Sequence, residues 1–138
     1  MITEVRLQTY WCDCDPAGIV YFGNFFRLFE QAEEELYLRA ARYRQRLLDG
    51  YSIWMPRVEA HVKFVSPIKN GRAIRIRIDP QFKGEKTVRF EIEVLDDEAG
   101  TQLATASVTV VCVDRANFKA RPIPDEIRQV LSGSLQKG

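Results

Sequence analysis

Asn24–Gly50 carries the pattern that decides the fold, in the sequence NFFRLFEQAEEELYLRAARYRQRLLDG. Its apolar residues recur at steps of three and four, which places them on one stripe of an α-helix. They are Phe25, Phe29, Ala32, Leu36, Ala40, Tyr43 and Leu47. We expect a helix from about Gly23 or Asn24 to about Leu48, roughly 36 Å long at 1.5 Å per residue, with Gly50 as a natural stop.

The charges of this segment follow the order that a helix dipole favours. Four glutamates between residues 30 and 35 precede four arginines between residues 39 and 46. The basic side chains therefore fall near the negative end of the dipole. The simplest interpretation is that these charges form the solvated face of the helix.

Period-two alternation flanks the helix on both sides and predicts strands. Residues 3–11 alternate before the helix, and four further stretches alternate after Gly50, at 52–66, 73–81, 87–95 and 103–114. Turn-forming pairs separate them, at Ser66-Pro67, Asn70-Gly71, Lys83-Gly84 and Ala99-Gly100. A short helix is expected over 124–131, where a proline and two acidic residues stand at the start.

The charged residues of the two middle strands predict how these strands pair. A hairpin centred on Gly84 sets Arg77 opposite Glu91, Arg75 opposite Glu93 and Asp79 opposite Arg89, and all three pairs are complementary. The same register puts the isoleucines at 74, 76 and 78 and the apolar residues at 88, 90, 92 and 94 on the opposite face. This arrangement is typical of a half-buried antiparallel sheet.

The order of elements predicts an α+β fold. A single amphipathic helix can cover only one face of a curved five-stranded antiparallel sheet. The chain has no internal repeat or linker, so we expect a single domain over residues 1–138. Five strands leave exposed edges that a second copy would protect, which favours a homodimer or homotetramer.

Composition excludes several classes of partner. The 138 residues are 46% hydrophobic and 28% charged, which suits a compact globular domain. Twenty basic residues against 19 acidic ones give no large positive field, so nucleic acid is not expected as a partner. The start of the chain, MITEVRLQTYW, lacks the features of a secretory signal, and no apolar run is long enough to span a membrane. We expect a cytoplasmic protein.

The three cysteines and the single histidine do not suggest a metal or disulfide site. Cys12, Cys14 and Cys112 form an odd count without C-x-x-C spacing, so reduced thiols are the simpler interpretation. Together with His61 they lack the paired spacing of a zinc site. We expect no metal.

The segment between the first strand and the helix carries the candidate chemistry. It reads CDCDPAGIVYFGN over residues 12–24, which is apolar for a loop and yet holds two acids. Asp15-Pro-Ala-Gly18 suits a type I turn, and this alone would explain the residues. The functional alternative is that the turn places a carboxylate beside the first amides of a long helix. These amides could stabilise the oxyanion that develops when a thioester carbonyl is attacked.

Two motifs resemble those of the 4-hydroxybenzoyl-CoA thioesterase family of hotdog proteins. They are Asp13-Cys-Asp-Pro-Ala-Gly-Ile-Val20 and Asn24-Phe-Phe-Arg27. The resemblance implies a five-stranded sheet wrapped around one long central helix, and hydrolysis of a small acyl-CoA without a cofactor. It also implies that Asp15 is the catalytic nucleophile or general base, and that the backbone amides of Phe22 and Gly23 polarise the thioester carbonyl.

The resemblance is weaker at the substrate-binding positions. Relatives often carry His or Tyr at position 22, and basic residues at 84 and 85, where this chain has Phe22, Gly84 and Glu85. Candidates for contacts with the coenzyme A phosphates are Lys83, Lys86 and Arg89, with solvated side chains as the alternative. Candidates for an aromatic or short-to-medium acyl pocket are Tyr21, Phe22, Phe25, Phe26 and Trp54, with plain core as the alternative.

Other interpretations of the same residues stay open at this point. A hydratase or dehydratase of acyl thioesters needs a histidine beside its aspartate, and only His61 is available. A module that binds acyl-CoA or an acyl-carrier protein without turnover would not need Asp15. We expect Asp13 to be structural and a Cys14–His61 nucleophile pair to be absent.

Overall fold

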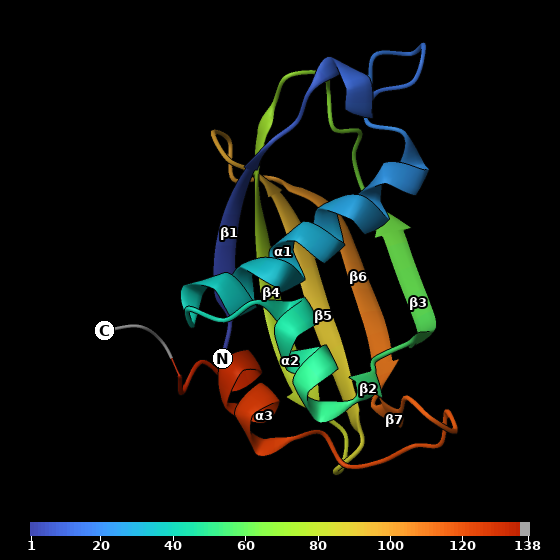
Figure 1. Cartoon of the computed structure of the whole chain (residues 1–138). Coiled ribbons are helices and arrows are strands. Elements are labelled where there is room, and N and C mark those ends of the chain that lie inside the picture. The colour runs from blue at the N-terminus through green and yellow to red at the C-terminus, as the bar shows by residue number, and fades with distance from the viewer. Residues whose placement is uncertain (136–138) are drawn as a thin grey trace.

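The computed structural model describes residues 1–135 and has a five-stranded antiparallel sheet with helix α1 lying across one face (Figure 1). The strand order is β1–β4–β5–β6–β3. The strands are β1 (Thr3–Gln8), β2 (Ile53–Trp54), β3 (Arg57–Phe64), β4 (Ala73–Phe82), β5 (Thr87–Asp96), β6 (Gln102–Val111) and β7 (Val113–Asp114). The helices are α1 (Phe25–Arg39), α2 (Arg44–Tyr51) and α3 (Asp125–Ser132), with short 3₁₀ turns η1 (Trp11–Asp13) and η2 (Phe22–Asn24). The α+β class and the short C-terminal helix are as expected.

The core lies between the sheet and α1. Alternate residues of β4 and β5 face the helix and are at most 5% exposed: Ile74, Ile76, Ile78, Val88, Phe90, Ile92 and Val94. On α1, Leu28, Phe29, Ala32 and Leu36 pack against them. The predicted inner face of the sheet is therefore confirmed. None of the described helices is long and apolar enough to cross a membrane.

The predicted register of the β4–β5 hairpin is wrong by two residues. Phe82 pairs with Val88, so the centre of the hairpin is Glu85 rather than Gly84. The reason is the turn, in which Gly84 has φ 82° and the Lys83 amide donates to the Thr87 carbonyl over 2.9 Å. A shift of two keeps every side chain on its expected face.

The predicted charge pairs change with this register. Arg77 lies opposite Glu93, and their side chains form an ion pair at 3.3 Å. Asp79 lies opposite Glu91 instead of Arg89. The arginines of β4 thus remain structural, but with other partners than the sequence suggested.

The single long helix expected from the sequence is broken at residues 40–43. The Arg42 amide donates to the Tyr37 carbonyl and the Ala41 amide to the Leu38 carbonyl, both over 2.9 Å. This is a Schellman ending, which requires a left-handed residue, and Ala41 has φ 56°. The apolar stripe hides the break because its spacing continues through it, although Tyr43 is in fact 58% exposed.

Replacing Ala41 with glycine should stabilise the protein by about 0.5–1 kcal/mol, because glycine adopts left-handed φ without the steric cost that alanine has. The measurement is the urea midpoint of unfolding. Ala40→Gly is the matched control, since Ala40 is 4% exposed and has φ −86°. It should destabilise the protein. An unchanged or lower midpoint for Ala41→Gly would contradict the strain assigned to this position.

A buried carboxylate closes the β5–β6 turn. Asp96 is 5% exposed, receives two hydrogen bonds from Arg72 at 2.8 and 3.0 Å, and accepts the Ala99 amide at 2.7 Å. The hydrogen bonds from Arg72 and Ala99 lower the pKa of Asp96 below its ordinary value of 3.8. The folded state therefore favours the ionised form more than the unfolded chain does.

This shift gives a pH dependence of stability with a defined sign. Because the pKa of Asp96 is lower in the folded protein, the ionised carboxylate stabilises the fold at pH values above the pKa of the unfolded chain. This stabilisation is lost as the pH falls through the pKa of the folded protein. The urea midpoint of wild type should exceed that of Asp96→Asn by a constant amount between pH 8 and 5. The difference should shrink once the pH falls below about 4. A difference that is independent of pH would rule out this account.

Candidate active site

Asp15 sits in a tight hairpin between η1 and η2. The Asp15 amide donates to the Ile19 carbonyl at 3.0 Å, and the Gly18 amide donates to the Asp15 carbonyl at 2.9 Å. Gly18 has φ 77°, as a type I turn followed by a left-handed residue requires. One carboxylate oxygen, Oδ1, accepts the Ala17 amide at 2.8 Å. Within residues 1–135 no group donates a hydrogen bond to Oδ2, so this oxygen is available for chemistry.

Asp13 ties the same loop to α1. Its side chain is buried, with Oδ2 accepting the Tyr10 amide at 2.8 Å and Oδ1 accepting Arg27 Nη2 at 2.5 Å. Its carbonyl oxygen accepts the Tyr21 amide at 3.0 Å and Asn24 Nδ2 at 2.8 Å. These contacts agree with the structural role expected for Asp13. The roles of Asn24 and Arg27 were not deduced from the sequence, although both residues stand in the second motif.

The amides proposed to bind the oxyanion lie in η2, directly before α1. Neither the Phe22 nor the Gly23 amide donates to an acceptor in the described part of the chain, as is usual at a helix start. A Cβ added at Gly23 would lie 2.8 Å from Cε2 of Tyr21. Glycine at this position therefore lets the Tyr21 ring pack over the backbone.

Asp15 opens into a cavity of about 300 Å³ that Phe22 and Phe25 also line. Phe64 closes it, with ring centroids 6.4 Å from Phe22 and 4.9 Å from Phe25. The remaining wall is Ile19, Val20, Val65, Ser66, Pro67 and Ile68. Residues 65–68 of this wall follow β3, and the sequence did not indicate them, because Ser66-Pro67 marks only a turn there.

Comparison with known proteins decides the family. Residues 9–131 match the model of the thioesterase-like superfamily. The chain belongs to this superfamily. The family resemblance expected from the two motifs is therefore confirmed, and the protein is a thioester hydrolase.

Several relatives align with this thioesterase over most of its length. A 1,4-dihydroxy-2-naphthoyl-CoA hydrolase of Thermosynechococcus vestitus is 29% identical over 127 residues, which cover 91% of this chain and 86% of the relative. The enzyme of the same name from Nostoc punctiforme is 32% identical, with 92% and 82% covered. Acyl-CoA thioesterase YbgC of Haemophilus influenzae is 24% identical, with 88% of each chain covered.

Solved structures confirm the hotdog fold. The crystal structure of a 1,4-dihydroxy-2-naphthoyl-CoA thioesterase from Synechocystis superposes with a TM-score of 0.89 at 22% identity. The match covers 95% of this chain and 96% of that one. At this identity the likeness supports the fold alone.

The other predicted acyl-pocket residues of the thioesterase do not all meet Asp15. Tyr21 is 46% exposed, and its ring lies tilted against that of Phe22, with the ring centroids 4.7 Å apart. Phe26 lines a separate cavity along α1. Trp54 lies on β2 under the Arg115 guanidinium, 3.6 Å from the ring centroid, and lines a third cavity.

The predicted coenzyme A contacts lie far from Asp15 within one chain. Lys83 and Lys86 are exposed in the β4–β5 turn, whereas the Asp15 loop stands at the other end of the sheet, at the top of Figure 1. Ten-residue strands separate the two ends by roughly 30 Å. Arg89 lies on the outer face of the sheet, 3.9 Å from Glu91.

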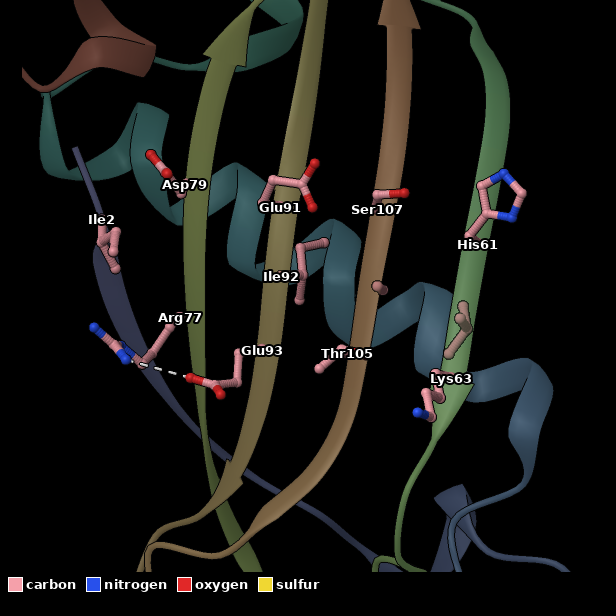
Figure 2. A pocket seen from close by; sticks show the side chains of 12 residues that line it. Ile2, His61, Lys63, Arg77, Asp79, Glu91, Ile92, Glu93, Thr105 and Ser107 are labelled. Atoms are coloured by element: carbon pink, nitrogen blue, oxygen red, sulfur yellow. Dashed lines mark hydrogen bonds and ion pairs between the residues drawn. The ribbon is translucent and has the colours of Figure 1, made fainter.

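A hollow of about 500 Å³ on the outer face of the sheet suits acyl-CoA poorly. Figure 2 shows this face with α1 behind the sheet, and the residues that line the hollow include Asp79 on β4 and Glu91 and Glu93 on β5. These carboxylates would repel phosphates. His61 lies here too, exposed and 2.6 Å from Glu59, and lines a different space from Asp15. The hydratase alternative, which needs both residues together, gains no support.

Cys14 does not have the environment of a nucleophile. Desolvation, with the nearby Asp13 and Asp15 charges, raises the pKa of the Cys14 thiol above its ordinary value. Its Sγ donates to the Tyr10 carbonyl at 3.6 Å. The thiol therefore stays protonated near neutral pH, as expected when no Cys14–His61 pair forms.

The charged face of α1 is not fully solvated, contrary to the expectation. Glu33 is 5% exposed because it continues the buried stripe one turn after Phe29. Its Oε2 is paired with Arg44 at 2.7 Å and with Arg57. Burial raises the pKa of Glu33, while the two arginines oppose the rise. Glu30 joins the same cluster, and its contacts with Arg57 and Arg44 lower its pKa despite partial burial.

Proposed function

We propose that this thioesterase hydrolyses the thioester of an aromatic or short-to-medium acyl-CoA at Asp15. The observation that carries the proposal is that Asp15 and Phe22 line one apolar cavity, and that within residues 1–135 neither Asp15 Oδ2 nor the Phe22 and Gly23 amides of η2 have a hydrogen-bond partner. A carboxylate beside preorganised N–H donors suits acyl transfer. The names of the relatives, which act on 1,4-dihydroxy-2-naphthoyl-CoA or on acyl-CoA, support this substrate class.

The reaction needs only water as co-reactant. The thioester carbonyl oxygen accepts hydrogen bonds from the Phe22 and Gly23 amides, which stabilise the negative charge that develops on it. Asp15 then either attacks the carbonyl carbon or takes a proton from an attacking water. In the first route the C–S bond breaks, a mixed anhydride forms and water cleaves it. In both routes the products are a carboxylic acid and the free thiol.

We further propose that the thioesterase is a homodimer joined through its β3 strands. β3 is an edge strand, and its residues include the exposed Val58 and Phe64, at 58% and 50%. Unpaired apolar edges favour association with a second copy. Antiparallel pairing of two β3 strands about a two-fold axis places the β4–β5 turn of one chain at the Asp15 end of the other.

This dimer would give the predicted phosphate contacts a role. The β4–β5 turn lies between two and three strands from the β3 edge, which is about 10–15 Å at the usual strand spacing. Lys83 and Lys86 of one copy would then stand within reach of a coenzyme A bound at Asp15 of the other. An acyl-carrier protein would present the same thioester and is the alternative donor.

The test is thiol release from a panel of aromatic and aliphatic acyl-CoA esters. Wild type should hydrolyse at least one aromatic ester with a kcat/KM in the ordinary range for enzymes, roughly 10⁴ M⁻¹s⁻¹ or more. If no ester is hydrolysed while the esters still bind, the protein is an acyl-CoA binding module and the proposed function is wrong. Acyl-carrier thioesters in the same panel decide between the two donors.

A further inference from the structure

The two edges of the sheet differ in how far the chain covers them. On β1 the inward-facing residues Thr3, Val5 and Leu7 are at most 8% exposed. On β3 seven of the eight residues are exposed, including Val58 at 58% and Phe64 at 50%. Within residues 1–135, β3 is therefore an open edge, and an open edge is suited to pair with a further strand.

The backbone of β3 alternates between bonding to β6 and facing the open edge. Directly after β3, the Val65 amide donates to the Leu103 carbonyl at 2.9 Å, and the same antiparallel register continues through the strand. Because hydrogen-bonded and non-hydrogen-bonded pairs alternate along such a ladder, residues 59, 61 and 63 bond to β6. The amides and carbonyls of Ala60 and Val62 therefore point to the open edge.

The side chains of β3 alternate between the two faces of the sheet. Those of Glu59, His61 and Lys63 stand on the outer face, where Figure 2 shows His61 and Lys63 beside β6. Ala60 and Val62 face the side that α1 covers. Glu59 contacts His61 Nε2 at 2.6 Å, and within residues 1–135 Lys63 has no ion-pair partner. The outer half of the edge thus presents a glutamate, a histidine and a lysine at successive positions.

Two copies of β3 can pair antiparallel about a two-fold axis in only a few registers. Residues that lie directly opposite each other must point to the same face, so one residue on the axis always meets its own counterpart. In the registers that keep most of the strand paired, this residue is Ala60, His61 or Val62. A bulge between Arg57 and Glu59 leaves residues 59–64 as the regular part of the strand, which disfavours an axis at Ala60.

The charges on the outer face select the register centred on His61. In this register Glu59 of each copy lies opposite Lys63 of the partner subunit, which gives two complementary pairs. An axis at Val62 would instead set Lys63 opposite His61 of the partner subunit and leave Glu59 without a cation across the edge. The edge is thus complementary to itself, and the partner that it fits is a second copy of this chain.

We propose that the β3 edge binds a second copy in the register centred on His61, with Glu59 of each copy paired to Lys63 of the partner subunit. The amides and carbonyls of Ala60 and Val62 exchange hydrogen bonds across the edge. The charged pairs fall at non-hydrogen-bonded positions, where opposite side chains lie closest. This register rests on the dimer proposed for the thioesterase and adds the residues that fix it.

The register bears on the active site because β3 ends beside the Asp15 cavity. Phe64 and Val65 line this cavity and are half exposed in one chain, at 50% and 48%. In the proposed register they lie opposite Val58 and Arg57 of the partner subunit. The second copy thereby covers one side of the cavity, and a shift of the register would move that cover.

Cysteine cross-linking tests the register directly. Opposite residues of a non-hydrogen-bonded pair have Cα atoms about 4.5 Å apart, which is within the range of a disulfide. Ala60→Cys, His61→Cys and Val62→Cys are made in a Cys12→Ser background, because Cys12 is the exposed cysteine, and are treated with oxidised glutathione. Only His61→Cys should give a covalent dimer on a non-reducing gel.

Charge reversal tests the two pairs independently of the cross-link. Glu59→Lys and Lys63→Glu each create two like-charged pairs across the edge, so the dimer dissociation constant should rise roughly tenfold in either variant. The combined variant restores opposite charges and should return to within about threefold of wild type. Both residues are exposed, so the fold should survive, and Arg46→Glu on α2 should leave the constant unchanged. The measurement is sedimentation at several protein concentrations.

The possible failures are distinguishable. A covalent dimer from Ala60→Cys or Val62→Cys in place of His61→Cys would overturn the register and leave the proposed dimer intact, and so would a combined variant no tighter than the single ones. A wild type that sediments as a monomer would overturn both the dimer and its register. A protein that dimerises in this register but hydrolyses no ester would overturn the proposed activity alone.

Discussion

Asp15→Asn should lower kcat/KM for the best acyl-CoA at least ~100-fold, on the scale of a lost principal acid-base or nucleophilic group. An amide neither attacks a thioester carbonyl as a carboxylate does nor takes a proton from water. The fold should survive, because the asparagine Oδ1 can still accept the Ala17 amide that holds the turn. The measurement is thiol release at saturating and limiting substrate, beside the urea midpoint of both proteins.

Asp13→Asn is the matched control on the same loop. Asp13 is buried against Arg27 and the Tyr10 amide, so the loss of its charge should lower the urea midpoint clearly. Asp15 is half-buried and pairs only locally, so Asp15→Asn should leave the midpoint close to wild type. Turnover by Asp15→Asn at the wild-type rate would mean that the catalytic carboxylate lies elsewhere.

Local patterns were sufficient to predict most of the elements and the turn that carries Asp15. The apolar stripe of α1 and the alternation of β4 and β5 depend on neighbouring residues, and both match the buried faces. The Asp15 turn is also local, since Asp, Pro and Gly each favour one backbone position of a type I turn. These features are visible in sequence because the chain specifies them within a few residues.

Contacts between distant segments could not be predicted in the same way. Ala41 gives no sign of a helix end in the sequence, because alanine favours the helix and only the structure shows its left-handed φ of 56°. The sequence predicts a solvated charge at Glu33, because its partner Arg57 is 24 residues away along the chain. Phe64 reaches the Asp15 cavity only because β3 ends beside η2. Lys86, which matches a basic position of the family, and its neighbour Lys83 stand at the end of the sheet opposite Asp15, so the predicted contacts with coenzyme A would require a second copy.

That requirement leads to a complementation experiment with two impaired variants. If the site is shared, mixed dimers of Asp15→Asn with a double variant, Lys83→Glu and Lys86→Glu, contain one intact site. That site combines Asp15 of the double variant with the lysines of the Asp15→Asn chain. Random mixing should restore about a quarter of wild-type activity at low substrate, since half of the dimers are mixed and each has one good site of two.

The double variant alone should raise KM for acyl-CoA roughly tenfold or more, because two cations near the phosphates become anions. Arg46→Glu on the exposed surface of α2 is the control and should leave KM unchanged.

Light scattering should give the wild type a mass near twice the 15.9 kDa of one chain. If mixing restores nothing although mixed dimers form, Asp15 and these lysines do not serve one site. If the wild type is a monomer, the phosphates must be bound by residues at the Asp15 end of the same chain, where Lys69 and Arg72 follow the wall of the cavity.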